Sequence, residues 1–456
     1  MIESLFNRKN PFFWFVFHII LGVISSISPF PLILYFFTIL LLSIPLIFKN
    51  KQINTPLNNV IVYLCSFEVL ARMSHTSPFI PYELGKYLMM FLFIIGILSG
   101  NNKGKSGALL FILLTPALFY DFSNQVNFKN IRFNILGSIN VGLAIWYFFK
   151  QRLTERGIYD IVILLCLPLV SILSFTLFRT PDFSDIDFKL GANFDTTGGF
   201  GSNQVSTVFG LGLFLIFFLW SHGITLTGKK LLDISTLFLF LFQGLLSFSR
   251  GGMIGSVLAI LVLLYFFAKI PNNSAIYLRL KKSRKYIIPG IMVMILSAGI
   301  ANNLTKGQLL LRYMGENTAT LTGVSERNLN TLTTGRFDIA LQDLDLFNDH
   351  FLTGVGAGAS MYLRRNSIGI VSHVEFTRLL AEHGILGLVC ILILFFIALK
   401  VRFMTNDAAF KGFLFACFLI AIYTTFHSAM RTYLAPILIG LSTVIIKNEK
   451  NPLHRE

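Results

Sequence analysis

Charge is scarce in this sequence. Only 13% of its 456 residues are Asp, Glu, Lys or Arg, whereas 54% are hydrophobic. A soluble domain carries about 25% charged residues because its surface faces water. The length alone would suggest two or three soluble domains. The shortage of charged residues excludes that organisation. Apolar runs recur from end to end, so we predict one membrane domain.

Cysteine is also rare. The four cysteines all lie inside apolar runs, at Cys65, Cys166, Cys390 and Cys417. They form no CxxC pair and no Cys/His spacing, so we interpret them as small hydrophobic side chains. Carboxylates with metal-ligand spacing are missing as well. The sequence predicts neither a disulfide framework nor a bound metal or other cofactor.

Long apolar runs, by contrast, are abundant. A membrane-spanning helix needs about 17–25 mostly apolar residues, and about fourteen such runs follow one another. They begin near Phe12, Pro31, Leu57, Glu83, Gly107, Phe133, Ile158, Asn203, Leu231, Gly251, Tyr286, Leu379, Gly412 and Thr432. The first run lacks a small-residue cleavage site and is interpreted as a retained helix. The predicted fold class is all-α, a polytopic transmembrane helix bundle.

The formal net charge of +16 could indicate a nucleic-acid partner, but its distribution argues against one. Basic residues lie in every second link between the apolar runs, from Arg8 and Lys9 at one end to Lys447 and Lys450 at the other. Cytoplasmic links carry this excess of Lys and Arg in membrane proteins. Both termini are therefore predicted to be cytoplasmic, with no nucleic-acid partner.

The chain divides into four predicted segments. N-terminal transmembrane helices cover 1–178, central ones cover 179–301, a large helical loop covers 302–372, and C-terminal transmembrane helices cover 373–456. A second long link on the same side of the membrane as the loop, 179–202, is rich in Asp and Gly. Long ordered loops usually carry function.

One helix is predicted inside the long loop. Residues 333–338 resemble a helix start, with Thr as the cap and Asp338 in the first turn. An apolar stripe at helical spacing follows, formed by Phe337, Leu341, Leu344 and Phe347. This helix would lie on the membrane surface or pack on the bundle. Gly354, Gly356 and Gly358 then predict a tight turn.

Polar residues gather at the non-cytoplasmic ends of the predicted helices. The candidates are Asn203, Arg250, Arg336, His373, Arg378 and Arg431. Arginine has a planar fork that binds phosphate oxygens in pairs, so such arginines suit a diphosphate headgroup. A histidine beside them could take a proton from an attacking hydroxyl. Clamped diphosphate is a good leaving group without a metal.

Each of these residues also has a structural interpretation. Arg250 can snorkel at the membrane interface, and Arg336 can be an ordinary loop charge. Glu375, Arg378 and Glu382 have the spacing of an intrahelical ion-pair ladder. His373 can be a loop-to-helix junction residue. The functional hypothesis depends on the gathering of these residues rather than on any one of them.

The motifs resemble the O-antigen ligase and polymerase superfamily of bacterial envelope glycan transferases. Ser-Arg-Gly-Gly at 249–252 opens a spanning helix, and Gly335-Arg336 introduces a helix that ends in Asp-His-Phe-Leu-Thr-Gly-Val-Gly at 349–356. Ser372-His373 and the segment 379–387 follow. The Gly-Ser-Asn-Gln at 201–204 is similar to the start of the family's preceding helix. The resemblance covers roughly 195–395.

The resemblance implies a large periplasmic loop, a multi-pass protein of the bacterial inner membrane, and metal-independent transfer from an undecaprenyl-diphosphate-linked glycan. Arg250 and Arg336 would bind the diphosphate, and His373 would be the catalytic residue that activates the acceptor hydroxyl. The secondary candidates are Asn203, Arg378 and Arg431. Val374 and Phe351 depart from the family pattern, where Asn and Pro are frequent.

The leading hypothesis is an inverting O-antigen ligase whose acceptor is lipid A-core. A repeat-unit polymerase, with a second lipid-linked glycan as the acceptor, is the nearest alternative, and a protein O-glycosyltransferase is another. From a different class, a flippase or transporter of lipid-linked oligosaccharide also has many helices and buried charges. Transporters tend to show repeated halves with midplane sites, and the sequence shows no matching halves.

Overall fold

The computed structural model describes residues 5–6, 9–49, 54–99, 104, 106–271, 277–278, 281, 287–324, 326–401, 405, 407–430 and 432–447. Almost all regular structure there is helical. The first part of the chain forms α2 (Pro11–Ile27), α3 (Phe30–Lys49), α4 (Asn54–Cys65), α5 (Glu68–Met73), α6 (Leu84–Ser99), α7 (Ser106–Leu114), the 3-10 turn η1 (Pro116–Leu118) and α8 (Phe128–Phe148). The predicted all-α class is confirmed.

The central part contains two deeply buried helices, Glu155–Arg179 and Ser202–Ser221. It forms β1 (Arg152–Thr154), α9 (Glu155–Arg179), η2 (Asp195–Thr197), α10 (Ser202–Ser221), α11 (Lys230–Leu246), α12 (Arg250–Phe267) and α14 (Ile287–Leu304). The Thr154 hydroxyl caps α9 by accepting from the N–H of Gly157 at 3.1 Å. Helix α9 packs against α2, α4 and α10, and this packing makes it the axis of the core.

The last two parts are the long loop and the C-terminal helices. The loop contains α15 (Gln308–Tyr313), α16 (Thr318–Leu321), α17 (Leu329–Leu332), α18 (Arg336–Asp349) and α19 (Ser360–Leu363). The chain then forms α20 (Glu375–Val401), α21 (Ala408–His427), α22 (Leu434–Leu441) and β2 (Ile445–Lys447). The strands β1 and β2 pair in parallel, with Leu153 opposite Ile446.

Seven described helices are long and apolar enough to cross a membrane. These spans are Phe30–Phe48, Phe128–Phe148, Glu155–Arg179, Ser202–Ser221, Arg250–Phe267, Glu375–Lys400 and Ala408–His427. Shorter apolar helices accompany them at Pro11–Ile27, Leu84–Ser99, Ser106–Leu118 and Met294–Leu304. The expected number of about fourteen spans and the cytoplasmic termini stay predictions.

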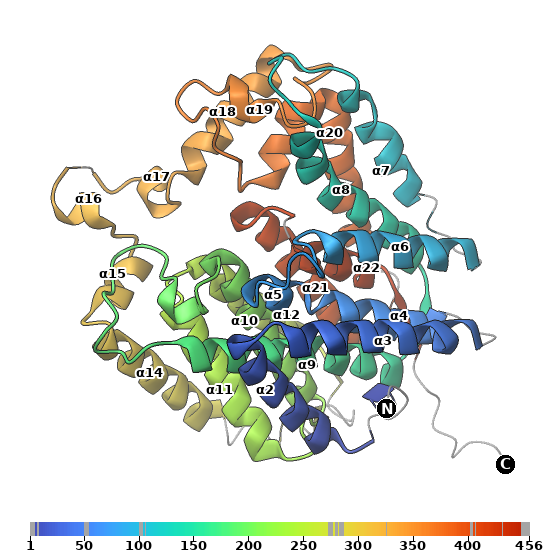
Figure 1. The fold of residues 1–456 in the computed structure, drawn as a ribbon, viewed down its shortest axis with the longest axis vertical. Coiled ribbons are helices and arrows are strands. Elements are labelled where there is room, and N and C mark those ends of the chain that lie inside the picture. Colours follow the sequence, from blue (N-terminus) through green and yellow to red (C-terminus); the bar gives the residue numbers. More distant parts are fainter. Residues whose placement is uncertain are drawn as a thin grey trace.

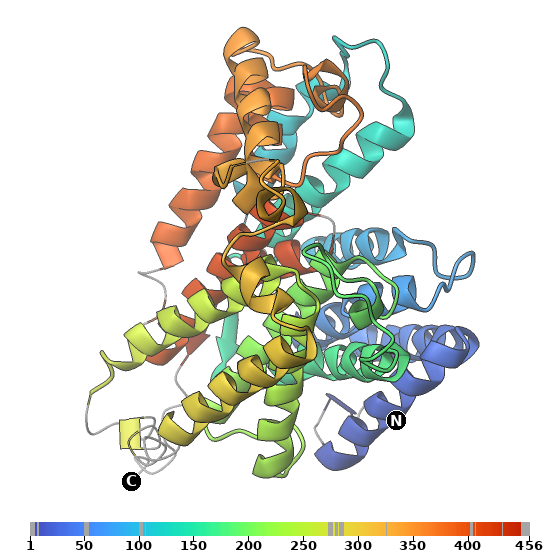
Figure 2. The ribbon, with the colours of Figure 1, turned by 90° about the vertical axis from the view of Figure 1, so that its left-hand side faces the viewer.

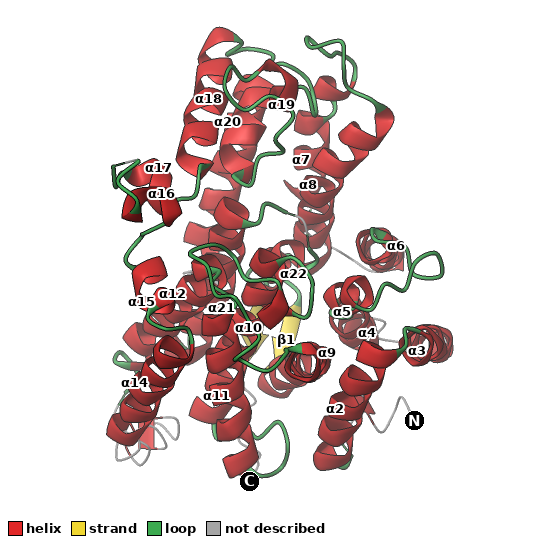
Figure 3. Cartoon of the chain, turned by 60° about the vertical axis from the view of Figure 1, so that its left-hand side comes forward, coloured by secondary structure: helices red, strands yellow, loops and turns green. Residues whose placement is uncertain are grey.

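Two groups of helices lie at the ends of the long loop, and α8 of the upper group also packs directly on α6 and α22 (Figure 1). Helices α18, α19 and α20 lie together with α7 and α8 at the top, and α10, α11, α12 and α14 lie below. Figure 2 shows α14, in yellow, leading up into the orange loop helices. In Figure 3, α15, α16 and α17 follow one another along one side, between α14 and α18. The loop thus connects the two groups.

The predicted loop helix exists as α18, but the predicted buried face is wrong. Its N-cap position is Gly335, with φ 81°, and the expected threonine cap comes from Thr333, whose hydroxyl accepts from the N–H of Phe337 at 3.1 Å. Its buried residues are Ile339 and Asp343, whereas Phe337 and Leu341 of the expected stripe are exposed. The reason is electrostatic pairing, because Asp343 meets a buried partner that directly follows α19.

That partner is Arg364. Its Nε lies 2.8 Å from Asp343 Oδ1, and both side chains are fully buried. The hydroxyl of Thr377 on α20 donates to the other oxygen of Asp343 at 3.0 Å. Burial raises the pKa of Asp343, and the charge and hydrogen bond of Arg364 oppose that rise. Asp343 therefore fixes which face of α18 is turned toward α20.

The glycine turn is confirmed, and it fits against a break in α20. Gly354, Gly356 and Gly358 all have positive φ. Helix α20 is interrupted at Gly384, with φ 57° and ψ −137°. The N–H of Gly356 donates to Glu382 O at 3.1 Å, and the N–H of Ile385 donates to Phe351 O at 2.7 Å. Backbone groups released by the break are satisfied by the loop.

Candidate functional site

The start of α12 is set by close packing of small residues. A side chain on Gly252 would clash with the backbone of Ser206 on α10, and one on Gly251 would clash with the ring of His427 on α21. Small residues let membrane helices approach closely. The Gly-Gly pair after Arg250 therefore holds the N-terminus of α12 between α10 and α21.

Asn203 belongs to the same junction. Its side-chain oxygen accepts from the hydroxyl of Ser249 at 2.8 Å, and the hydroxyl of Ser206 donates to Ser249 Oγ at 2.9 Å. The hydroxyl of Thr207 donates to the Asn203 carbonyl at 2.7 Å. The two sequence motifs at 201–204 and 249–252 are thus hydrogen-bonded to each other.

Arg250, the first residue of α12, reaches into the long loop. Its Nη1 donates to the carbonyl oxygen of Arg312 at 2.9 Å, and its Nη2 donates to the carbonyl oxygen of Leu332. These carbonyls lie in α15 and at the end of α17. One guanidinium therefore joins a membrane helix to two helices of the loop.

A cavity of about 460 Å³ opens beside this junction. Its lining combines two arginines with amide and hydroxyl side chains from the loop. The lining residues are Leu190, Gly191, Ala192, Asn203, Arg312, Asn317, Asn330, Thr331, Thr334, Gly335 and Arg336. The two long links, 179–202 and 302–372, therefore both contribute to one cavity, together with the start of α10.

Arg336 lies at the start of α18 and at the edge of this cavity. Its Nη1 donates to the hydroxyl of Thr334 at 3.2 Å and to the carbonyl of Thr333 at 3.4 Å. Its charge interacts with Arg312 across the cavity and with His427. Arg250 and Arg336 therefore both act on the charge of Arg312.

Arg312 is the second arginine of the cavity, and it is more deeply buried. Only 7% of the residue is exposed. Its Nε donates to the carbonyl of Phe248 at 3.4 Å. Burial, together with the like charges of Arg250 and Arg336, lowers the pKa of Arg312 to about 10. Three guanidinium groups thus share one electropositive region.

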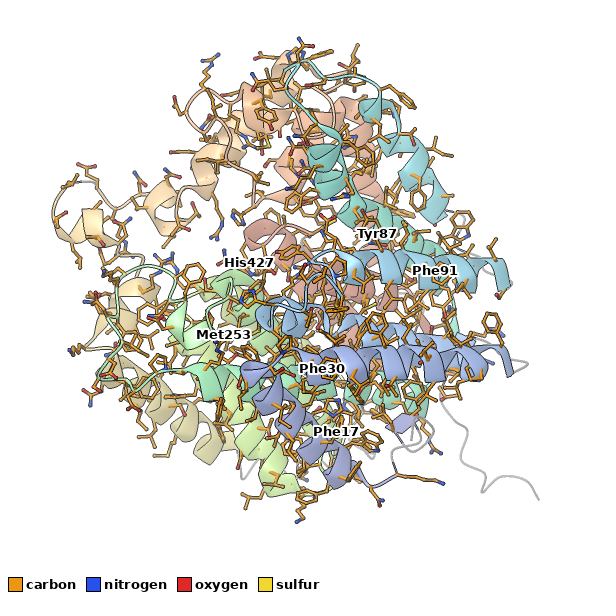
Figure 4. The ribbon with its side chains drawn as sticks, viewed as in Figure 1. Phe17, Phe30, Tyr87, Phe91, Met253 and His427 are labelled. Carbon is orange, nitrogen blue, oxygen red and sulfur yellow. The ribbon has the colours of Figure 1, made fainter. Side chains whose placement is uncertain are left out.

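His427 completes the wall formed by α21. Its Nε2 lies 2.8 Å from the hydroxyl of Thr207, and its Nδ1 lies 3.2 Å from the carbonyl of Tyr423. Figure 4 shows His427 near the middle of the molecule, above Met253 of α12. Both ring nitrogens are engaged within the protein, so this histidine supports the packing around Arg250.

His373 lies where the long loop enters α20, and it is half-buried. The neighbouring Ser372 hydroxyl accepts from the N–H of Val374 at 3.1 Å and so shapes the turn before the helix. The carbonyl of His373 accepts from the N–H of Ala429 at 3.1 Å. This bond attaches His373 to the segment that follows His427.

In the described part of the chain, no group of three or more His, Cys, Asp or Glu side chains could hold a metal ion. The described carboxylates near α20 are instead engaged with arginines. The charged lining of the cavity itself comes from guanidinium groups. The cavity is therefore suited to an anion.

Comparison with known families adds an independent observation. Residues 235–392 match a family model described as O-antigen ligase. This match supports the resemblance to the O-antigen ligase and polymerase superfamily. No curated protein and no solved structure matches the chain.

The matched segment runs from α11 through the whole long loop into α20, so it contains Arg250, Arg312, Arg336 and His373. The O-antigen ligase family implies a glycosyltransferase-like enzyme of the cell envelope with lipid-linked glycan substrates. The apolar helices accord with a membrane protein. The expected resemblance to this superfamily is confirmed.

Two secondary candidates have a different outcome. Arg378 is buried in α20, where it pairs with Glu375 and with Glu382, the latter at 2.8 Å. It also donates to the carbonyl of Asn134 at 2.9 Å. The structural alternative of an ion-pair ladder is therefore confirmed for these residues. Arg431 lies outside the described residues.

Sequence motifs did not reveal Arg312 or the amide-rich wall formed by Asn317 and Asn330. No motif marks Arg312, which follows three leucines in a short helix. The one available signal was its position as a basic residue in the long loop. Asn317 and Asn328 each begin a short helix as capping-box residues, and this pattern was readable from the sequence.

Proposed function

We propose that the protein transfers a preassembled glycan from undecaprenyl diphosphate to a hydroxyl of lipid A-core, on the periplasmic side of the inner membrane. The observation that carries this proposal is the cavity lined by Arg312 and Arg336 and tied to Arg250. Guanidinium forks bind phosphate oxygens in pairs and keep their charge beside hydrocarbon. The family match supports an O-antigen ligase-like function in the cell envelope.

The chemistry follows from these groups. The arginines hold the diphosphate while the prenyl tail stays in the lipid. His373 takes the proton of the acceptor hydroxyl. The oxygen attacks the anomeric carbon from the side opposite the diphosphate, the bond from that carbon to the diphosphate oxygen breaks, and the configuration inverts. The arginines stabilise the charge that develops on the leaving diphosphate, so the step requires no metal.

Transfer in vitro tests the proposal. Purified full-length protein is mixed with a synthetic prenyl-diphosphate-linked glycan and lipid A-core, in the presence of a chelator. The expected result is glycosylated lipid A-core of inverted anomeric configuration, together with released prenyl diphosphate.

Other outcomes would contradict the proposal in distinguishable ways. Extension of one lipid-linked glycan by another, with lipid A-core left unchanged, would identify a polymerase. Movement of the intact donor across vesicles without transfer would identify a transporter. Loss of activity in the chelator, restored by a divalent cation, would contradict the metal-independent step.

A further inference from the structure

The three arginines of this region are used in different ways. Both terminal nitrogens of Arg250 donate to backbone carbonyls, those of Arg312 and Leu332, and Arg250 does not line the cavity. Arg312 lines the cavity, and its side chain forms one hydrogen bond to the described part of the chain, from Nε at 3.4 Å. Its two terminal nitrogens, which form the fork that binds phosphate, are thus left for the cavity.

The charges around Arg312 favour the binding of an anion. Among the described residues no carboxylate forms an ion pair with it, and its charged neighbours are Arg250 and Arg336. A buried charge costs several kcal/mol unless a partner of opposite sign compensates it. Surrounding like charges raise that cost. A site with these properties is stabilised when a multivalent anion enters the cavity.

We propose that Arg312 is, with Arg336, a direct diphosphate-binding residue of the cavity, and that Arg250 is a positioning residue that fixes Arg312 and the end of α17. This inference rests on the proposed function and deepens it. It assigns to Arg312 the role that the family resemblance implies for Arg250.

Arg250 positions two short helices of the long loop, α15 and α17. Helix α15 has six residues and α17 has four, so neither is stable alone in water. Arg250 attaches both to the N-terminus of the membrane helix α12. The wall that carries Arg312 therefore keeps its place relative to Arg336 through the two bonds from Arg250.

Binding of short prenyl ligands separates these roles. The full chain, purified in detergent, is titrated with farnesyl diphosphate and with farnesol. The wild type is expected to bind the diphosphate more tightly than the alcohol. Arg312→Gln should weaken binding of farnesyl diphosphate about tenfold or more, because a charged hydrogen-bond donor is lost. Its affinity for farnesol should not change, and Arg312→Lys should retain part of the diphosphate affinity.

Hydrogen exchange of the segment 308–335 provides the second measurement. Arg312→Gln should leave its exchange as in the wild type, whereas Arg250→Gln should accelerate it and weaken diphosphate binding at the same time. Arg365→Gln, which removes an exposed arginine of the same loop, is the matched control and should change neither measurement.

Each contrary result has a separate meaning. Wild-type affinity for farnesyl diphosphate in Arg312→Gln, with loss in Arg336→Gln, would overturn the role of Arg312 and leave the proposed function standing. Weakened binding in Arg250→Gln without faster exchange would overturn its positioning role. A wild type that binds farnesol as tightly as farnesyl diphosphate would contradict the proposed function itself.

Discussion

The backbone N–H of Ala429 donates to the carbonyl oxygen of His373 at 3.1 Å. This bond joins the end of the long loop to the segment just after α21. His427, two residues before Ala429, packs on Gly251 beside Arg250. The proposed base and the arginine motif therefore meet the same end of α21, although the sequence separates them by more than a hundred residues.

Ala429 has φ 52°, in the left-handed region that β-branched residues avoid. Ala429→Val should shift the backbone that supports His373, so we expect a lower kcat with little change in KM for the donor. Ala429→Gly, which adopts this φ without strain, is the matched control and should keep the wild-type kcat. Equal kcat in the wild type and both variants would show that this bond does not position His373.

The buried ion pairs of Arg378 predict a large effect on stability. The side chains of Arg378, Glu375 and Glu382 are at most 5% exposed. Arg378→Met would leave two buried carboxylates without their partner, which costs about 3–5 kcal/mol. The measurement is thermal unfolding in detergent, where the melting temperature should fall sharply.

Two further variants serve as controls for this prediction. Combining Arg378→Met with Glu375→Gln and Glu382→Gln removes all three charges and should recover most of the stability. Lys189→Ala, which breaks an exposed pair with Asp187, should have little effect. If Arg378→Met stayed as stable as the wild type but lost transfer, Arg378 would instead act in the catalytic site.

Asp121, in the loop between α7 and α8, should make the stability of the folded protein depend on pH. Burial raises its pKa, but hydrogen bonds from the Ser123 hydroxyl and the N–H groups of Ser123 and Val126 outweigh burial, so the pKa lies below its usual value. An aspartate whose pKa is lowered by folding stabilises the folded state at pH values above its pKa in the unfolded state, about 3.9. This stabilisation is lost as the pH falls through the lower pKa of the folded state.

Asp121→Asn should therefore melt at a lower temperature than the wild type at neutral pH. The difference should begin to shrink as the pH falls below about 4 and should disappear only below the lowered pKa of the folded state, where the folded carboxyl is protonated as well. Asp182→Asn, at an exposed position, is the control and should follow the wild type at every pH. A difference between Asp121→Asn and the wild type that does not depend on pH would contradict this explanation.

The features that could be predicted from the sequence are local. The ladder at Glu375, Arg378 and Glu382 depends on helical spacing within seven residues, and the turn at Gly354 and Gly356 depends on residues that tolerate positive φ. Both follow from short-range geometry. The superfamily resemblance was likewise visible because its motifs are contiguous.

The features that could not be predicted depend on distant partners. The buried face of α18 is set by Arg364 and Thr377, which follow Asp343 by 21 and 34 residues. The place of Arg312 depends on a bond from Arg250, 62 residues earlier. The interruption of α20 at Gly384 is compensated by a loop from another part of the chain. Periodicity carries no information about such contacts.

The role of His373 as the base is tested by the rate of glycan transfer by His373→Ala, compared with that of His350→Ala. Both variants remove a histidine from the long-loop region, and both should insert and fold as the wild type does in a thermal unfolding assay. We predict that His373→Ala loses transfer while it still binds farnesyl diphosphate, and that His350→Ala retains transfer. Unimpaired transfer by His373→Ala would remove the proposed base and contradict the account.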